Sequence, residues 1–158
     1  KMKTPTQRDP VSYGSTADAA LKLFVVLSRA HRAISEHTRR DQERHGLGAT
    51  EFAVLEALYH KGPLLVGEVG ARILLTSGST TYVIDKLEQR DLVSRRPCDT
   101  DRRALYVDLT REGKALIRRI FPAHAKAVEA AMAGLSLEEQ KQVTELLKRL
   151  GHTAQEAL

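Results

Sequence analysis

A run of hydroxyl-bearing residues, followed by sequence with helical periodicity, carries the clearest chemistry in this chain. Residues 77–81 read Ser-Gly-Ser-Thr-Thr, and Tyr82 and Lys86 follow four residues apart, away from Val83 and Leu87. Hydroxyls in the first turn of a helix can bond phosphates or base edges, and a glycine lets the backbone approach closely. An ordinary N-capped helix start has the same residues, and Lys86 could equally be solvated. We predict a recognition helix whose candidate DNA contacts are Ser77, Gly78, Ser79, Thr80, Thr81, Tyr82 and Lys86.

A second cluster is an arginine-rich turn at residues 95–103. It combines four arginines with two acids, namely Arg95, Arg96, Arg102, Arg103, Asp99 and Asp101. Arginine suits phosphate and the electronegative minor groove, whereas acids near DNA would be repelled and need a reason. Asp101 lies two residues before Arg103 and could hold its guanidinium by a charge-assisted bond. A solvated charged turn is the alternative, less favoured next to the helix before it. The turn predicts a β-wing with candidate contacts Arg96, Asp101, Arg102 and Arg103.

Hydrophobic periodicity and capping residues predict the elements that position these clusters. Four helices should precede two short strands with two-residue alternation, and two more helices should follow. The expected elements are a helix from residue 15 or 16 to 43 with a stop at Gly46, helices 50–61 (N-cap Thr50), 66–74 and 77–90, strands 93–96 and 104–109, a helix capped by Thr110 with a kink at Pro122, and a last helix after a capping box at Ser136.

This order predicts a mainly α fold with a small β-wing, a winged helix-turn-helix in a single domain of residues 1–158. Residues 1–14 would be a flexible arm, 50–110 the DNA-binding lobe, and 15–46 and 111–158 dimerisation helices. The first and last helices are too apolar, and too far from the lobe, for ordinary surface helices. We expect them to pack against a second copy in a homodimer. The last helix has an apolar side that we expect to face inward: Leu137, Val143, Leu146, Leu147 and Leu150.

Composition restricts the class of protein further. The 158 residues carry a net charge of +5 and a pI of about 9.5, which favours a polyanionic partner such as DNA. Aromatic residues make up 4% and Trp is absent, which argues against readers of RNA or single strands that stack bases. No apolar run approaches the roughly 20 residues that cross a bilayer, and no secretory signal is recognisable. A single cysteine suits a reducing compartment, so we expect a cytoplasmic protein without a membrane partner.

The wing carries a recognisable pattern. Residues 99–113 read DTDRRALYVDLTREG and match D-x-D-R-R-A-x-x-V-x-L-T-x-x-G. With the preceding helix, this resembles the multiple antibiotic resistance regulator (MarR) family, and the helix order is similar across about residues 17–150. The resemblance implies an obligate dimer through the first, fifth and sixth helices. It also implies an inverted repeat of duplex DNA as partner, usually near the protein's own promoter, and release by oxidation or by a small aromatic or amphipathic ligand.

By matched position, the resemblance implies roles for individual residues. Arg103 would enter the minor groove with Asp101 orienting it, and the groove contacts would be Ser77, Ser79, Thr80 and Thr81. Two features depart from the family. The third helix starts at Leu65-Val66-Gly67 without a Ser or Thr cap and should start poorly. The first helix has no cysteine, which excludes the peroxide-sensing mechanism that uses one there.

Cys98 lies in the wing turn, where we expect it to be exposed. Its modification would disturb DNA contact directly, and Arg96 would favour the thiolate while Asp99 would oppose it. Cys98 is therefore a candidate redox or electrophile sensor, although an incidental turn residue is the favoured interpretation.

A ligand cleft is expected between the dimer base and the lobe. Its candidate lining is His31, Ile34, His37, Leu55 and Tyr59, although Leu55 and Tyr59 could simply be core residues. The histidines do not predict a metal site, because His31, His37 and His45 are spaced six and eight residues apart and so do not share one helical face. Asp41 and His45 do have i, i+4 spacing, but one pair is not a site.

No motif of an enzyme is present: there is no P-loop, G-x-S-x-G, H-E-x-x-H or C-x-x-C. We expect neither an enzyme nor a cofactor. The sequence favours a double-stranded DNA-binding transcriptional regulator, a repressor released by a small ligand. The alternatives are a winged-helix dimer that acts as a protein-interaction module and a constitutive DNA binder without an effector.

Overall fold

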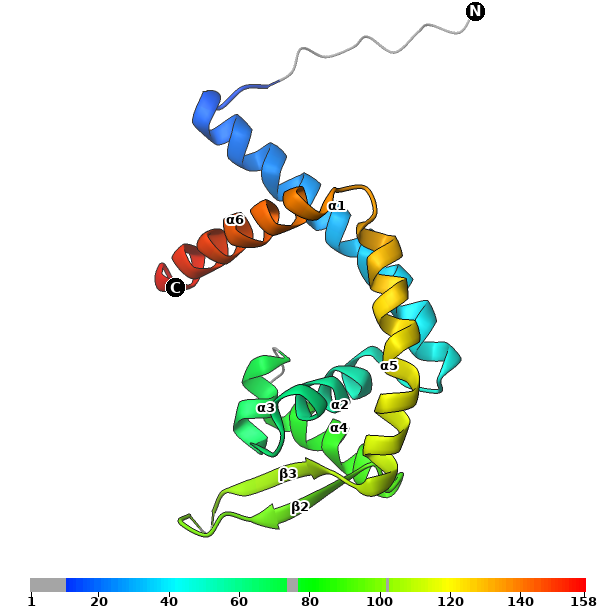
Figure 1. Ribbon diagram of the computed structural model, residues 1–158. Coiled ribbons are helices and arrows are strands. Elements are labelled where there is room, and N and C mark those ends of the chain that lie inside the picture. The colour runs from blue at the N-terminus through cyan, green and yellow to red at the C-terminus, as the bar shows by residue number, and fades with distance from the viewer. Residues whose placement is uncertain (1–10, 74–76, 102) are drawn as a thin grey trace, which may run out of the picture.

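The computed structural model describes residues 11–73, 77–101 and 103–158, and it is mainly helical with one small sheet (Figure 1). The mainly α fold with a β-wing is confirmed. The elements are α1 (Ser15–Arg44), α2 (Ala49–Lys61), β1 (Leu64–Leu65), α3 (Val66–Arg72), α4 (Ser77–Gln89), β2 (Val93–Pro97), β3 (Leu105–Leu109), α5 (Arg111–Met132) and α6 (Leu137–Glu156).

Two parts of the molecule are visible in Figure 1. Helices α1 and α5 run side by side, and α6 projects from the far end of α5. Together these three helices form the base of the molecule. At the other end of α5, helices α2, α3 and α4 and the sheet form a compact lobe. The hairpin of β2 and β3 lies on the side of the lobe away from α6, so α5 connects the hairpin to the base.

The lobe encloses the hydrophobic core. Apolar side chains from α2, α3, α4, the sheet and the first half of α5 share it, among them Phe52, Leu55, Val69, Ile84, Leu87, Val93, Val107, Ile117 and Ile120. All of these are almost inaccessible to solvent, and burial of a side chain of this size contributes about 1.5–3 kcal/mol. The core therefore holds α4 and the hairpin in one orientation.

The sheet has three strands where the sequence predicted two. Strand β1 pairs antiparallel with β3, Leu64 opposite Val107, and the strand order is β1-β3-β2. In the hairpin, Val93 lies opposite Leu109 and Pro97 opposite Leu105. A strand of two residues is too short to show the alternation by which strands are recognised, so β1 was missed.

Two helix starts differ from expectation. Helix α2 begins after Gly48 rather than at Thr50, and the Gly48 amide donates to Glu51 Oε2 at 3.0 Å. At the start of α3, the Leu65 amide donates to Glu68 Oε2 at 2.9 Å. This carboxylate replaces part of the missing Ser or Thr cap, so α3 does not start as poorly as the sequence indicated.

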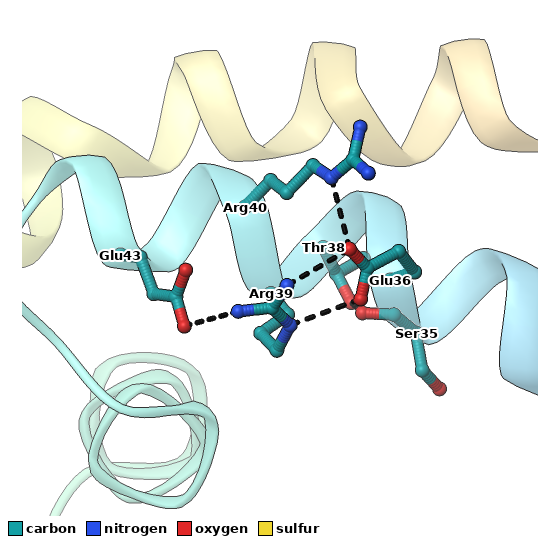
Figure 2. Close-up of polar contacts among 6 residues, drawn as sticks. All are labelled: Ser35, Glu36, Thr38, Arg39, Arg40 and Glu43. Atoms are coloured by element: carbon teal, nitrogen blue, oxygen red, sulfur yellow. Dashed lines mark hydrogen bonds and ion pairs between the residues drawn. The ribbon is translucent and has the colours of Figure 1, made fainter.

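The polar second half of α1 is tied together by ion pairs along its own surface (Figure 2). Glu36 accepts from Arg39 at 2.8 Å and from Arg40 at 2.9 Å, and Arg39 also pairs with Glu43. Pairs at this spacing contribute only about 0.2–0.5 kcal/mol each. They add to the stability of this half of α1, and they leave the guanidinium groups of Arg39 and Arg40 engaged with carboxylates.

A buried polar contact joins the two helices of the base next to the lobe. His124 Nδ1 of α5 lies 3.2 Å from Asp41 Oδ2 of α1, and both side chains are buried. The His124 ring also lies against Phe52 of α2, with 4.2 Å between ring centroids. This contact between α1, α5 and α2 was not predicted, because 83 residues separate Asp41 from His124.

Helix α5 starts as the sequence predicted. Thr110 Oγ1 accepts from the Gly113 amide at 2.9 Å and donates to the Asp91 carbonyl at 2.6 Å. Gly113 packs so closely that a Cβ placed there would lie 1.9 Å from the carbonyl oxygen of Leu92. The Thr and Gly of the T-x-x-G pattern therefore join the wing to α5, one by capping and the other by close packing.

Thr110→Val should lower the stability of the protein by about 1 kcal/mol, because valine keeps the shape of threonine but leaves the Gly113 amide without its cap. In a chain of this size that corresponds to a fall of roughly 2–4 °C in Tm. Thermal unfolding at a fixed protein concentration measures it. The matched control is Thr144→Val, whose hydroxyl bonds only the Gln140 carbonyl within α6; an equal loss in both variants would contradict the capping role.

The apolar side of α6 does not face inward in the single chain, contrary to the prediction. All residues of α6 lie in the described part of the structure, and none of them is buried. Leu146 is 53% exposed, and Phe24, in the first half of α1, is 69% exposed. Leu23 of α1 and apolar residues of α6 line a shared hollow of about 550 Å³: Val143, Leu146, Leu147 and Leu150. An apolar surface of this kind is a typical interaction site.

Across the three described ranges, no helix combines the length and apolar character that a bilayer span requires.

Candidate nucleic-acid interface

Helix α4 is held to the core by one side and exposed on the other. The buried side consists of Thr80, Val83, Ile84 and Leu87. Thr80 is only 1% exposed, so its prediction as a groove contact is wrong. Thr80 precedes Val83 by three residues and Ile84 by four, which is the spacing of residues on one face of a helix. This spacing could have identified Thr80 as a buried residue from the sequence.

The remaining hydroxyl residues at the start of α4 are accessible. Ser77, Ser79 and Thr81 are exposed, and so is Tyr82 one turn later. Around Gly78, apart from its chain neighbours and the nearby helix backbone, no described atom lies within 4 Å of where a Cβ would stand. The exposed side chains at the start of α4 are therefore accessible to an incoming phosphate or base edge. The turn at residues 74–76 lies outside the described residues.

Lys86 lies on the exposed side of α4 but is engaged with α2. Its Nζ lies 2.9 Å from Glu51 Oε1, and Arg90 binds the other oxygen of Glu51 at 3.2 Å. Burial opposes ionisation of Glu51, but the Gly48 amide and the two cations outweigh it and place the pKa of Glu51 below its usual value. Lys86 therefore positions α4 against α2, and it can reach DNA only by leaving Glu51.

The wing turn has its own hydrogen bonds. The Cys98 amide donates to the Ala104 carbonyl at 3.0 Å. The Arg103 amide donates to Asp101 Oδ1 at 2.9 Å. Asp101 was predicted to hold the guanidinium of Arg103, and the structure instead shows it bound to the backbone. Asp101 therefore shapes the turn, as Asp commonly does. It positions Arg103 by binding its backbone amide and not its guanidinium. Arg102 lies outside the described residues.

Two arginines of the hairpin lie on opposite faces of β2. Arg96 is exposed and its guanidinium stacks over the ring of Tyr106 at 4.9 Å from the centroid. Arg95 points the other way, toward α4, and binds Asp85 and Glu88. Alternation along a strand requires this division. Arg96 is thus available on the hairpin surface, whereas Arg95 is engaged with the recognition helix.

A hollow separates the exposed side of α4 from the wing. Its volume is about 820 Å³, and its lining includes Thr81, Asp85, Arg95 and Arg103 together with residues of β1 and the start of α3. The structure thus brings Thr81 and Arg103, which were predicted from separate motifs, to one concave surface. Arrangements of this kind let a helix and a wing reach adjacent grooves of one duplex.

Cys98 is half-buried rather than exposed as predicted. Its sulfur lies 3.2 Å from the Thr100 hydroxyl. That contact, followed by the amides of Thr100 and Asp101, lowers the pKa of the Cys98 thiol. Hydrogen bonds within the turn, and not the expected competition between Arg96 and Asp99, therefore favour the thiolate. Its use as a sensor stays a prediction.

The five residues predicted for a ligand cleft differ in their exposure in the single chain. Leu55 is fully buried in the core, so it does not line an accessible cleft, as the alternative interpretation held. Tyr59 contacts the rings of His60 and Phe121 at 5.1 and 5.9 Å between centroids. His31 and His37 are exposed on α1 and Ile34 is half-buried. Within the described residues no group of three metal-binding side chains lies together.

A three-helix lobe with an exposed hydroxyl-rich helix beside an arginine-bearing hairpin defines a winged helix-turn-helix DNA-binding protein. Residues 45–104 match the model of the MarR family. The HTH-type transcriptional regulator MhqR of Bacillus subtilis is 48% identical over 139 residues, which cover 88% of this chain and 96% of that protein. The chain therefore belongs to the MarR family of transcriptional regulators.

Two further relatives agree. The homoprotocatechuate degradative operon repressor of Escherichia coli is 28% identical over 137 residues, 85% of this chain and 93% of that protein. The structure of Bordetella bronchiseptica BpsR, described with regulation of its DNA binding by 6-hydroxynicotinic acid, superposes with a TM-score of 0.74 at 25% identity, over 82% of this chain and 98% of that one. Two of these three relatives are named as a transcriptional regulator and a repressor, and the third binds DNA, which does not favour the alternative of a protein-interaction module.

Proposed function

We propose that this regulator is a homodimeric repressor that binds a pseudo-palindromic operator and leaves it when a small aromatic ligand binds. The observation that carries the proposal is the shared concave surface of α4 and the wing, where Thr81 and Arg103 line one hollow. The helix would enter the major groove through Ser77, Gly78, Ser79, Thr81 and Tyr82. The wing would reach the flanking minor groove through Arg103, with Arg96 and Arg102 near the backbone.

The second copy is inferred from the base. The apolar residues of α6 and of the first half of α1 are exposed in the single chain, and Leu23 shares a hollow with the leucines of α6. Isologous packing of two such surfaces would bury both at once. A dimer also supplies two recognition helices related by a two-fold axis, which a pseudo-palindrome requires.

The effector is inferred from the relatives. One represses an operon for homoprotocatechuate degradation, and another has its DNA binding regulated by 6-hydroxynicotinic acid. Both names contain a small aromatic acid, so we propose a ligand of this kind. Its site would lie between base and lobe, where His31, His37 and Tyr59 are accessible. Because the target is chromosomal DNA, we place the protein in the cytoplasm.

The proposal is tested by titrating the protein with a duplex that carries its own promoter, at several salt concentrations. We expect log K to fall steeply and linearly with log salt, because each neutralised phosphate releases counterions. A random duplex of equal length should bind at least about 1,000-fold more weakly at physiological salt. Equal affinity for both duplexes, or no salt dependence, would contradict the proposal.

Ser79→Ala and Thr81→Ala should change base preference more than salt dependence. Loss of one base-edge hydrogen bond alters discrimination by about 1 kcal/mol, or roughly fivefold, at one base pair of each half-site. Affinities for operators with single base-pair changes measure this, and the slope against salt should stay that of the unaltered protein. Thr144→Ala in α6 serves as control. A uniform loss on all sequences would instead assign both hydroxyls to phosphates.

A further inference from the structure

Arg95 is a charged residue that the structure places between the recognition helix and the wing. It lies in the middle of β2, opposite Val107 of β3. Its side chain is only 17% exposed. It binds Asp85 Oδ1 at 2.6 Å and Glu88 through its other terminal nitrogen, and it lies 3.4 Å from the Thr81 carbonyl oxygen. All three partners belong to α4.

The partners of Arg95 follow the axis of α4. Thr81, Asp85 and Glu88 are spaced four and three residues apart, so they lie on one face of the helix over two turns. A guanidinium is planar, and its donors form a fixed fork, so two carboxylates bound at once define its position and direction. Arg95 therefore fixes both the distance and the angle of β2 relative to α4 along this face.

The same contacts remove Arg95 from direct binding of DNA. Its positive charge faces two carboxylates, so this group of three residues carries a net negative charge that disfavours phosphate. Arg96 on the other face of the strand is exposed and bound to no carboxylate among the described residues. The two neighbouring arginines thus differ in role although the sequence presents them as one basic pair.

The base of the hairpin is attached to the lobe without Arg95. Val93 is buried in the core, the Leu92 amide donates to the Leu87 carbonyl at 3.0 Å, and the Thr110 amide donates to the Leu92 carbonyl at 3.1 Å. Arg95 lies further toward the turn, opposite the buried Val107, and beyond it the strand residues Arg96, Pro97 and Leu105 are exposed. Its loss should leave the lobe folded but free the outer hairpin to move against α4.

We propose that Arg95 is a positioning residue for DNA binding, which sets the wing at the spacing that lets α4 and Arg103 occupy adjacent grooves together. The inference rests on the proposed function. Arg95 touches no DNA in this account and acts through the two carboxylates of α4. The consequence is a coupling: the contribution of Arg103 to affinity depends on Arg95.

The first test is Arg95→Met, which keeps the length of the stem and removes the charge. We expect operator affinity to fall about tenfold, with hydroxyl-radical protection lost at the outer minor grooves and guanine N7 protection retained in the half-sites. In a double-mutant cycle, Arg103→Ala should lower operator affinity much less in the Arg95→Met variant than in the unaltered protein, because the wing of that variant is already displaced. Additive losses in the cycle would overturn the proposal.

The second test distinguishes positioning of the wing from direct contact between Arg95 and DNA, because the two roles predict opposite changes in operator affinity. Asp85→Asn with Glu88→Gln leaves Arg95 in place, removes both anchors and makes the protein more positive by two charges. If Arg95 contacts DNA directly, freeing it should strengthen binding. If Arg95 positions the wing, affinity and outer protection should fall as in Arg95→Met despite the added charge.

The matched control is Arg39→Met, because Arg39 is also held by two carboxylates, Glu36 and Glu43, but on α1 (Figure 2). It should leave the affinity and the footprint unchanged. Thermal unfolding separates positioning from folding: a loss of binding that tracks a fall in Tm, with all protections lost together, would overturn the proposal. If the unaltered protein shows no specific duplex, the proposed function itself fails, and that outcome is distinct from a normal footprint in Arg95→Met.

Discussion

Arg103→Ala is expected to weaken operator binding by about 10- to 100-fold, which is roughly 1.4–2.7 kcal/mol. Arg103 is exposed, lines the hollow beside α4, and is presented by a turn in which Asp101 binds its backbone amide at 2.9 Å. A guanidinium in the narrow, electronegative minor groove is a favoured contact. Each dimer loses two such contacts, which increases the effect on a two-fold operator.

Titration at several salt concentrations measures the effect of Arg103→Ala, and the slope of log K against log salt should also become shallower. Lys148→Ala removes one positive charge at the far end of the protein, in α6, where Lys148 pairs with Glu145. It should leave affinity within about twofold, since surface pairs contribute little. Unchanged affinity in Arg103→Ala would show that the wing assignment is wrong.

Leu146→Lys with Leu150→Lys is expected to separate the dimer and lower operator affinity by at least about 100-fold. Both leucines are exposed in the single chain and line the hollow beside Leu23. Burial of unpaired ammonium groups in an apolar interface is strongly unfavourable. A monomer also loses the high effective concentration that ties the second half-site to the first, which contributes about 10²- to 10⁴-fold.

Light scattering measures the mass of the Leu146/Leu150 variant, and circular dichroism checks that its helices remain. Glu145→Lys adds the same two units of charge on the other side of α6 and should stay dimeric with full affinity. The added positive charge alone would strengthen binding to DNA, so a loss of affinity has to come from the interface. A variant that remains a dimer would show that this surface is not the interface.

The elements that the sequence predicted well are those that depend on neighbouring residues. The Thr110 cap, the capping box at Ser136 and the alternation of β3 act over a few residues, and the structure has each of them. The helical spacing of Val83, Ile84 and Leu87 also located the buried side of α4 correctly. The same spacing includes Thr80, whose hydroxyl led to the incorrect assignment as a groove contact.

The features that the sequence did not predict depend on residues far apart in the chain. Glu51 binds Lys86 and Arg90 across 35 and 39 residues, and Asp41 binds His124 across 83. Arg95 was grouped with the wing arginines because nothing in its neighbours showed that Asp85 and Glu88 would face it. Charged residues can pair with DNA or with each other, and only the fold decides between the two.

The ionic contacts around α4 have a common consequence. Glu51 holds the helix from α2, and Arg95 holds it from β2. Together with the buried core, they fix the direction in which the hydroxyl-rich end points. Helix α5 then connects the wing to the base through the Thr110 cap and the close approach of Gly113 to Leu92.

In the proposed complex, two copies of this surface read one duplex with two-fold symmetry. Selection of bound duplexes from random DNA, followed by sequencing, tests it most directly. We expect an inverted repeat whose half-sites lie about 34 Å apart, one helical turn of roughly 10 base pairs. Its flanking positions should lose their base preference in Arg103→Ala. A single unpaired half-site, or no enriched sequence, would contradict it.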